Sequence, residues 1–311
     1  MTLASAFWPR KFPNLPASVR REFDVEPGSR ILAKCHWHAE PQLKPTLVLL
    51  HGLEGSSESG YMLGAAEKAF RAGFNVLRVN QRNCGGTANL TPTLYNSGLS
   101  GDMRAVVNEL IHRDGLPEIF TAGSSMGGNI MLKMAGEYGG APPAQLKGVI
   151  GICPAIDLSA CADDLAEFRN LIYSRHFVSS LKQSMKLKAA LYPGMYSLDG
   201  LNRVRTVRQF DDVITARYCG FRDAEDYYYR ASALRVIAAI RVPTLIMTAQ
   251  DDPFVPFATF QNGTFAANPN VTLIAPRHGG HCAFISRERG EERFWAEARL
   301  VEFCKSKSAL L

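Results

Sequence analysis

The sequence lacks the features that mark membrane-spanning and nucleic-acid-binding proteins. None of its apolar stretches reaches about 18 residues, so we expect no transmembrane helix and no stable membrane insertion. Its 311 residues carry a net charge of +6, and no run of five basic residues concentrates that charge. Because nucleic-acid-binding proteins usually gather basic residues on one element, we expect no nucleic-acid partner.

The sequence also lacks the cysteine spacings of metal sites and of disulfide frameworks. Its seven cysteines are irregularly spaced, and no CxxC pair occurs. We therefore predict reduced thiols in a cytoplasmic protein that has no metal and no cofactor. Residues 1–16 are interrupted by Trp8, Arg10 and Pro13, so we expect no signal peptide there. The oligomeric state stays open.

What the sequence does contain is a regular alternation of predicted strands and helices. A hairpin is expected over residues 20–25 and 30–37, joined by the turn sequence Glu26-Pro27-Gly28-Ser29. Helical periodicity follows several of the later strands, as in residues 62–70, 103–111, 130–135 and 294–301. This alternation predicts a mostly parallel sheet with helices on both faces. The predicted later strands are residues 46–50, 75–79, 119–122, 146–153, 244–248 and 271–274.

A long insertion interrupts this alternation. About 90 residues separate Cys153 from Thr244, whereas a crossover between parallel strands needs only about a dozen. The insertion contains helical patterns, and no linker rich in Pro, Gly or Ser flanks it. We therefore predict a core formed by residues 1–154 and 236–311, with residues 155–235 as a helical cap over the site.

The clearest motif is Gly123-Ser124-Ser125-Met126-Gly127, a G-x-S-x-G sequence. It lies between a predicted strand and a predicted helix, which is the context of the nucleophile in the α/β-hydrolase fold. Without that context the motif is weak, since a glycine-rich turn gives the same letters. Ser125 is the predicted nucleophile, and Ser124 is the competing serine with the wrong spacing to the glycines.

A second glycine-containing loop, His51-Gly52-Leu53-Glu54-Gly55, follows the first strongly buried strand. In the α/β-hydrolase fold this loop supplies one oxyanion donor, and the residue after the nucleophile supplies the other. The predicted donors are the N–H groups of Leu53 and Met126. An ordinary strand-to-helix turn is the alternative interpretation. His51 stands too early in the chain to be the base of this fold.

The acid and the base are predicted on two late loops, in the chain order that this fold requires. Asp252 follows the strand over residues 244–248, and we prefer it to Asp251 because of its D-x-x-V-P spacing. His281 follows the last strand, and its G-G-H-x-x-F pattern favours it over His278. In the predicted mechanism His281 takes the proton of Ser125, and Asp252 orients the imidazole.

Several further stretches resemble one particular family. They are His51-Gly52-Leu53-Glu54-Gly55-Ser56, Asn80-Gln81-Arg82-Asn83-Cys84-Gly85-Gly86, Leu94-Tyr95-Asn96-Ser97-Gly98, Gly123 to Asn129, Phe210-Asp211-Asp212 and Asp226-Tyr227-Tyr228. Together with the Asp252 and His281 loops they resemble the YheT-like α/β-hydrolases, which are related to the α/β-hydrolase-domain proteins one to three and to plant embryogenesis-associated proteins. The resemblance covers roughly residues 45–300. It implies hydrolysis of carboxylic esters with short- to medium-chain acyl groups, or of lipids.

We therefore predict a serine-dependent carboxylic-ester hydrolase with a small-molecule acyl ester as its substrate. Two alternatives stay open. An alcohol acyltransferase would use the same acyl-enzyme with an alcohol as acceptor. A binding protein could use the same scaffold without catalysis, because fold does not fix function. The acyl-chain length and the alcohol moiety are not determined by the sequence.

Overall fold

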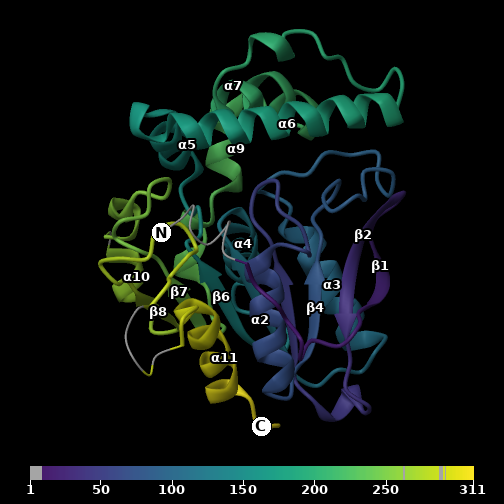
Figure 1. The fold of residues 1–311 in the computed structure, drawn as a ribbon, viewed down its shortest axis with the longest axis vertical. Coiled ribbons are helices and arrows are strands. Elements are labelled where there is room, and N and C mark those ends of the chain that lie inside the picture. The colour runs from purple at the N-terminus through teal and green to yellow at the C-terminus, as the bar shows by residue number, and fades with distance from the viewer. Residues whose placement is uncertain (1–8, 262, 287–289, 291) are drawn as a thin grey trace.

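An eight-stranded sheet forms the centre of the computed structural model, which describes residues 9–261, 263–286, 290 and 292–311 (Figure 1). The strand order is β1-β2-β4-β3-β5-β6-β7-β8. β1 pairs antiparallel with β2 and β2 with β4, and all later pairings are parallel. The bounds are β1 Val19–Glu26, β2 Ser29–His36, β3 Thr46–Leu50, β4 Asn75–Val79, β5 Ile119–Ser124, β6 Leu146–Ile152, β7 Thr244–Met247 and β8 Val271–Ile274.

The central strands are buried on both faces, as their continuous apolar sequences predict. Side chains alternate between the faces of a strand, and β3 shows this clearly. Leu47 and Leu49 belong to the hydrophobic cluster on one face, whereas Val48 and Leu50 belong to the cluster on the other. The sheet therefore has a separate core on each side.

Helices cover both faces. α3 (Ser100–His112) and α4 (Met126–Tyr138) pack on one face, while α2 (Gly60–Arg71) and α11 (Trp295–Lys307) pack together on the other. The short α10 (Gly263–Ala267) precedes β8, and the sequence patterns did not predict it. This arrangement is the α/β-hydrolase fold that the alternation predicted. Short 3₁₀ turns add η1 Pro41–Leu43, η5 Ala233–Arg235, η6 Ile237–Ala239 and η7 Phe257–Phe260.

Between β6 and β7 the chain forms a layer of helices beyond the end of the sheet (Figure 1). This helical layer has a hydrophobic cluster of its own, which includes Val178, Leu181 and Met185 of α6. Its elements are α5 Leu158–Ala166, η2 Phe168–Asn170, α6 Leu171–Leu191, η3 Leu201–Arg203, α7 Val207–Phe210, the π-helix η4 Asp211–Ala216, α8 Arg217–Cys219 and α9 Ala224–Ala231.

The predicted elements recur with small changes in their ends. The strand expected over residues 146–153 ends at Ile152, and the one expected over 244–248 ends at Met247. β5 runs two residues further than expected, to Ser124, immediately before the predicted nucleophile. Residues 1–8, half of the segment 1–16 where we expected no signal peptide, lie outside the described residues. In the part of the chain that is described, no helix is long and apolar enough to cross a membrane.

Candidate active site

Ser125 occupies the turn between β5 and α4 in an unusual backbone conformation. Its φ is 55° and its ψ is −121°, a region that residues other than glycine rarely adopt. The turn is held in place because the Ser125 N–H donates a hydrogen bond of 2.8 Å to the Ile152 carbonyl on β6. Such strain persists only where the surrounding structure imposes it, and it often occurs at functional sites.

The glycines of the G-x-S-x-G motif are required by close backbone contacts. A Cβ on Gly123 would collide with the carbonyl of Gly127, and a Cβ on Gly127 would collide with the carbonyl of His51. Neither obstacle is a flexible side chain that could move aside. The motif therefore brings the turn at Ser125 against the loop that follows β3.

That loop passes directly beside Ser125. A Cβ on Gly52 would lie 3.0 Å from the Ser125 Cβ, and the Gly52 N–H donates a hydrogen bond of 3.0 Å to the Tyr61 hydroxyl. The next residue, Leu53, lines the same cavity as Ser125 and Met126. Within the described part of the chain, neither the Leu53 N–H nor the Met126 N–H has a protein acceptor. Both donors are thus available to a ligand.

His281 and Asp252 form a buried pair. The His281 Nδ1 lies 2.9 Å from Asp252 Oδ2 and 3.1 Å from Oδ1. Asp252 Oδ1 also accepts hydrogen bonds of 3.0 and 3.1 Å from the N–H groups of Phe254 and Val255. His281 lines the cavity together with Ser125. The structure therefore brings together the three residues that the motifs selected.

The two members of this pair shift each other's pKa in opposite directions. Burial alone would raise the pKa of Asp252, but the His281 charge and the backbone donors lower it. Burial alone would lower the pKa of His281, but the Asp252 carboxylate and Cys282 raise it well above its ordinary value. The pair therefore stabilises an imidazolium, the state that a general base reaches after taking a proton.

The competing pair, Asp251 and His278, lies nearby but in a different setting. Asp251 accepts hydrogen bonds of 2.8 Å each from the N–H groups of Gly279 and Gly280, and its carboxylate lies 3.2 Å from the His278 Nδ1. The His278 side chain is 74% exposed and does not line the cavity. Asp251 thus fixes the backbone of the loop that carries His281.

His51 is fully buried beside the site and bonded within the protein. Its Nε2 accepts a hydrogen bond of 3.1 Å from the Gln81 N–H, and its Nδ1 lies 2.7 Å from the Gly52 carbonyl. Burial lowers its pKa to about 4, so the ring is neutral at physiological pH. A neutral ring with a donor on one nitrogen and an acceptor on the other fits both contacts. His51 therefore holds the loop before Leu53 in place.

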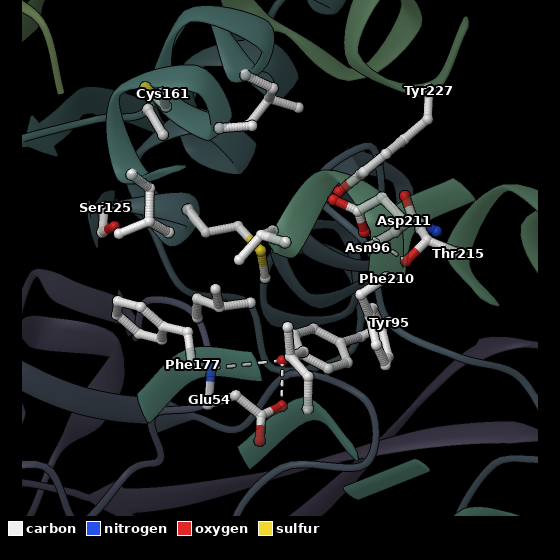
Figure 2. A pocket seen from close by; sticks show the side chains of 18 of the residues that line it. Glu54, Tyr95, Asn96, Ser125, Cys161, Phe177, Phe210, Asp211, Thr215 and Tyr227 are labelled. Carbon is white, nitrogen blue, oxygen red and sulfur yellow. Dashed lines mark hydrogen bonds between the residues drawn. The ribbon is translucent and has the colours of Figure 1, made fainter. Parts of the chain in front are cut away.

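The cavity in front of Ser125 lies between the sheet and the helical layer (Figure 2). Its empty space is about 1110 Å³, including the part open to solvent. Most of its walls are apolar, and the layer contributes Leu158, Leu165, Phe177, Leu181, Met185 and Phe210. Binding sites for small molecules are typically apolar clefts with a few placed polar groups. This cavity has that composition.

Glu54 is a polar group of the cavity wall that joins the loop after β3 to the helical layer. Its Oε2 accepts hydrogen bonds of 2.7 Å each from the hydroxyls of Ser180 and Ser184 on α6. Its Oε1 accepts one of 2.5 Å from the Tyr95 hydroxyl, and its N–H donates to the same hydroxyl (Figure 2). Glu54 has a φ of 54° and directly follows Leu53.

A second acid, Asp211, lies at the start of the π-helix η4 and also lines the cavity (Figure 2). It accepts hydrogen bonds of 2.6 Å from the Thr215 hydroxyl and 2.7 Å from the Tyr228 hydroxyl. Burial raises its pKa to about 6, although both hydroxyls act against this shift. Nearby, the Tyr227 hydroxyl accepts a bond of 2.9 Å from the Ser97 N–H, so these residues also attach the layer to the core.

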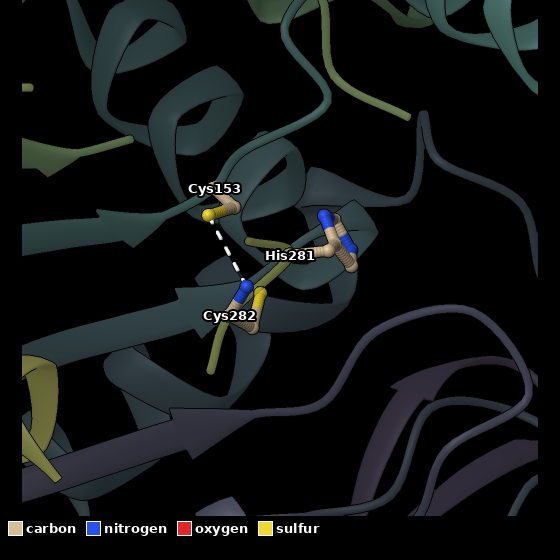
Figure 3. A group of neighbouring side chains, drawn as sticks. All are labelled: Cys153, His281 and Cys282. Carbon is tan, nitrogen blue, oxygen red and sulfur yellow. Dashed lines mark hydrogen bonds between the residues drawn. The ribbon is translucent and has the colours of Figure 1, made fainter. Parts of the chain in front are cut away.

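Two thiols lie beside the His281 loop (Figure 3). Ligand atoms of Cys153, His281 and Cys282 lie within 4.8 Å of one another, a donor set that would suit zinc. His281 is already engaged by Asp252, and the Cys282 N–H donates a hydrogen bond of 3.3 Å to the Cys153 Sγ. Cys282 also contacts the Ile152 carbonyl at 3.5 Å. Through these contacts the two thiols hold the His281 loop against the end of β6.

Comparison with known proteins agrees with this fold. The family described as the alpha/beta hydrolase fold matches residues 45–288, and the chain therefore belongs to the α/β-hydrolase family. Within that family it is a YheT-like protein. It is 34% identical over 267 residues to the Escherichia coli protein YheT. The matched region covers 85% of this chain and 78% of YheT.

Other relatives carry lipase names. The chain is 29% identical over 252 residues to phospholipase ABHD3 of Mus musculus. The matched region covers 80% of this chain and 60% of that protein. It is 31% identical over 276 residues to a monoacylglycerol lipase of Saccharomyces cerevisiae. That matched region covers 84% of this chain and 59% of the lipase. The chain thus spans less than two thirds of the length of these two relatives.

Solved structures share the fold at low sequence identity. The Pyrococcus furiosus esterase Pf2001 has a TM-score of 0.61 and is 18% identical, with 96% of this chain and 97% of that chain covered. Est1E from Butyrivibrio proteoclasticus has a TM-score of 0.59 and is 16% identical, with 93% and 99% covered. At these identities the likeness concerns the fold alone.

Some groups at the site were not selected by sequence reasoning. Glu54 stands inside the predicted oxyanion loop, but no pattern in the sequence indicates its bonds with α6. Its partners there, Ser180 and Ser184, lie 126 and 130 residues further along the chain. Asp211 stands in a stretch that we connected with the family and not with the cavity. The approach of Cys153 to Cys282 spans 129 residues and likewise has no signal in the sequence.

Proposed function

We propose that this protein is a serine-dependent carboxylic-ester hydrolase. Ser125 is the nucleophile, His281 is its general base, and Asp252 orients the imidazole and stabilises its protonated form. The observation that carries this proposal is the meeting of the strained Ser125 and the buried His281–Asp252 pair at one apolar cavity. In the reaction Ser125 attacks the ester carbonyl, the alcohol leaves, and water releases the acid from the acyl-enzyme.

The N–H groups of Leu53 and Met126 are the proposed oxyanion donors. Preset donors aimed at the developing negative charge contribute on the order of 3 kcal/mol each in related chemistry. The absence of protein acceptors for both groups, within the described residues, supports this role. Met126 is also the first residue of α4, where the helix dipole favours negative charge.

We further propose that residues 155–235 form a cap that shapes the acyl site. The apolar side chains that this segment contributes to the cavity favour acyl esters of short to medium length. The names of two sequence relatives, an esterase and a monoacylglycerol lipase, agree with a small-molecule ester substrate. A cytoplasmic location is proposed on the seven cysteines, none of which is paired.

Acyl transfer to an alcohol is the second candidate. The cavity walls are mostly apolar, which would favour an alcohol over water as the acceptor. One relative, 25% identical, is named a medium-chain fatty acid ethyl ester synthase/esterase. Adding ethanol to the ester assay distinguishes the two reactions, because transfer yields an ethyl ester in place of the free acid.

The test of the proposed function is hydrolysis of p-nitrophenyl esters from acetyl to long acyl chains, with Ser125→Ala alongside. We expect activity in the parent alone, and the chain-length optimum then measures the acyl site. Equal activity in both proteins would remove Ser125 as nucleophile. Inactivity of the folded parent on every ester, with and without ethanol, would favour a binding function on this scaffold.

A further inference from the structure

The large hydrophobic side chains that face solvent are concentrated in one part of the helical layer. Eleven such side chains are exposed among the described residues, and six of them lie between residues 168 and 198. Phe168 is 88% exposed and Ile172 is 75% exposed. The other four are Leu187, Leu191, Met195 and Leu198. We call these six side chains, with the outward-facing residues of α6, the outer surface of the layer.

The same segment has charge of one sign. Residues 168–198 contain no Asp and no Glu, but they contain Arg169, Arg175, Lys182, Lys186 and Lys188. Lys188 points inward and is buried, and Arg169 pairs with Asp164. Arg175 and Lys186 remain exposed on α6. The outer surface is therefore both apolar and basic.

The two faces of α6 differ because of its helical repeat. Side chains three and four residues apart lie on the same face of a helix. The inward face is buried and includes Ser174, Val178, Leu181, Met185 and Lys188. The opposite face is exposed and includes Ile172, Arg175, Ser179, Gln183, Lys186 and Leu187. α6 runs across the end of the molecule beyond the sheet (Figure 1).

We propose that the outer surface of the helical layer docks on an anionic lipid surface. Exposed apolar side chains beside Lys and Arg suit the boundary between acyl chains and negatively charged headgroups. A second copy of this chain is a poorer occupant, because facing copies would bring the same basic residues together. The proposed contact is made by side chains of the outer surface alone.

The outer surface lies on the same helix as part of the cavity wall, which suggests what the docking would do. Phe177, Leu181, Ser184 and Met185 of the same helix line the cavity in front of Ser125. One helix thus separates the proposed lipid surface from the proposed acyl site. Docking would hold the cavity close to esters that are dissolved in the lipid phase. The docking itself does not depend on catalysis by Ser125, so it can be tested separately.

The experiment is co-sedimentation of the full chain with vesicles of phosphatidylglycerol or of phosphatidylcholine, at low and at high salt. We expect binding to phosphatidylglycerol that weakens as salt screens the charges. The apolar variant Ile172→Asp/Leu187→Asp and the charge variant Arg175→Glu/Lys186→Glu should each bind roughly tenfold less, or weaker still. The matched controls are Val19→Asp and Leu43→Asp, at side chains that are 61% and 60% exposed outside this surface.

Each outcome decides the proposal. Loss of binding in both surface variants, with parental binding in both controls, would support it. No binding to phosphatidylglycerol at low salt, equal binding to both lipids, or equal loss in the controls would overturn it. Circular dichroism and thermal unfolding verify that each variant is folded. Sedimentation velocity without lipid tests for a dimer that the surface variants dissociate, a result that would assign the surface to a second copy.

Discussion

The sheet core around Ser125 and the helical layer above it are built in different ways. In the core, backbone meets backbone: the turn at Ser125 fits only because Gly123 and Gly127 have no side chains. The layer is held by side-chain contacts, among them the cluster of Val178, Leu181 and Met185 and hydroxyl groups bonded to acids. Backbone contacts fix positions more strictly than side chains do, so the core should tolerate change least.

The largest effect is expected from Gly127→Ala in the core. The new Cβ would meet the His51 carbonyl, which cannot move without displacing the loop that carries Leu53. We expect destabilisation by about 3 kcal/mol or more and loss of ester hydrolysis, measured by denaturant unfolding and by the p-nitrophenyl ester assay. The control is Gly101→Ala in α3, where a Cβ meets nothing within 4 Å. Comparable damage from both changes would contradict the comparison.

Asp252→Asn should come next, with kcat lower by on the order of 10⁴-fold. In the parent, His281 accepts a proton only when it is neutral, so activity should fall as pH falls through its raised pKa. Without the carboxylate that pKa drops, and the acid limb of the kcat/KM profile should move to lower pH.

The control for this prediction is Asp251→Asn, which keeps a carbonyl oxygen for the N–H groups of Gly279 and Gly280. We expect a small loss of activity and an unmoved acid limb. If Asp251→Asn shifted the limb and Asp252→Asn did not, the acid of the triad would have to be reassigned.

A smaller effect is expected at the joint between the two regions. Glu54→Gln keeps the size of the side chain but weakens its bonds to Ser180 and Ser184, because charged acceptors form stronger hydrogen bonds. We expect kcat/KM to fall by roughly tenfold, since the next residue, Leu53, is a proposed oxyanion donor. The double variant Ser180→Ala/Ser184→Ala should show the same loss. Parental kinetics in both variants would show that the bonds between Glu54 and α6 do not affect the active site.

The smallest effect is expected inside the layer, at Asp211. Its folded-state pKa of about 6 exceeds the ordinary value of 3.8, so the folded state holds its proton more tightly than the unfolded state. This group should therefore destabilise the fold increasingly as pH rises from about 4 to about 6, by roughly 1–3 kcal/mol in total.

Asp211→Asn, whose side chain does not titrate, should flatten the pH dependence of the unfolding free energy in that window. Asp212→Asn, in the same π-helix, removes a negative charge that raises the Asp211 pKa, so it should reduce that slope only in part. Urea unfolding at a series of pH values measures both. An unchanged slope in Asp211→Asn would show that Asp211 does not titrate in this range.

The sequence by itself determined the succession of strands and helices along the chain and the family. It also selected Ser125, Asp252 and His281 as candidates, because this fold needs its turn glycines and its acid and base at fixed places in the chain order. The buried strands could be predicted from the sequence because each is short, apolar and followed by a turn. Their ends moved by one or two residues, since pairing with neighbours decides where a strand stops.

Only the tertiary structure decided which groups from distant parts of the chain meet. The bonds of Glu54 to α6, the fastening of Cys282 to Cys153 and the pKa shift of Asp211 all depend on contacts or burial that local sequence does not encode. The same holds for the exposed side of α6, because its apolar residues occur on both faces and only packing shows which face is covered.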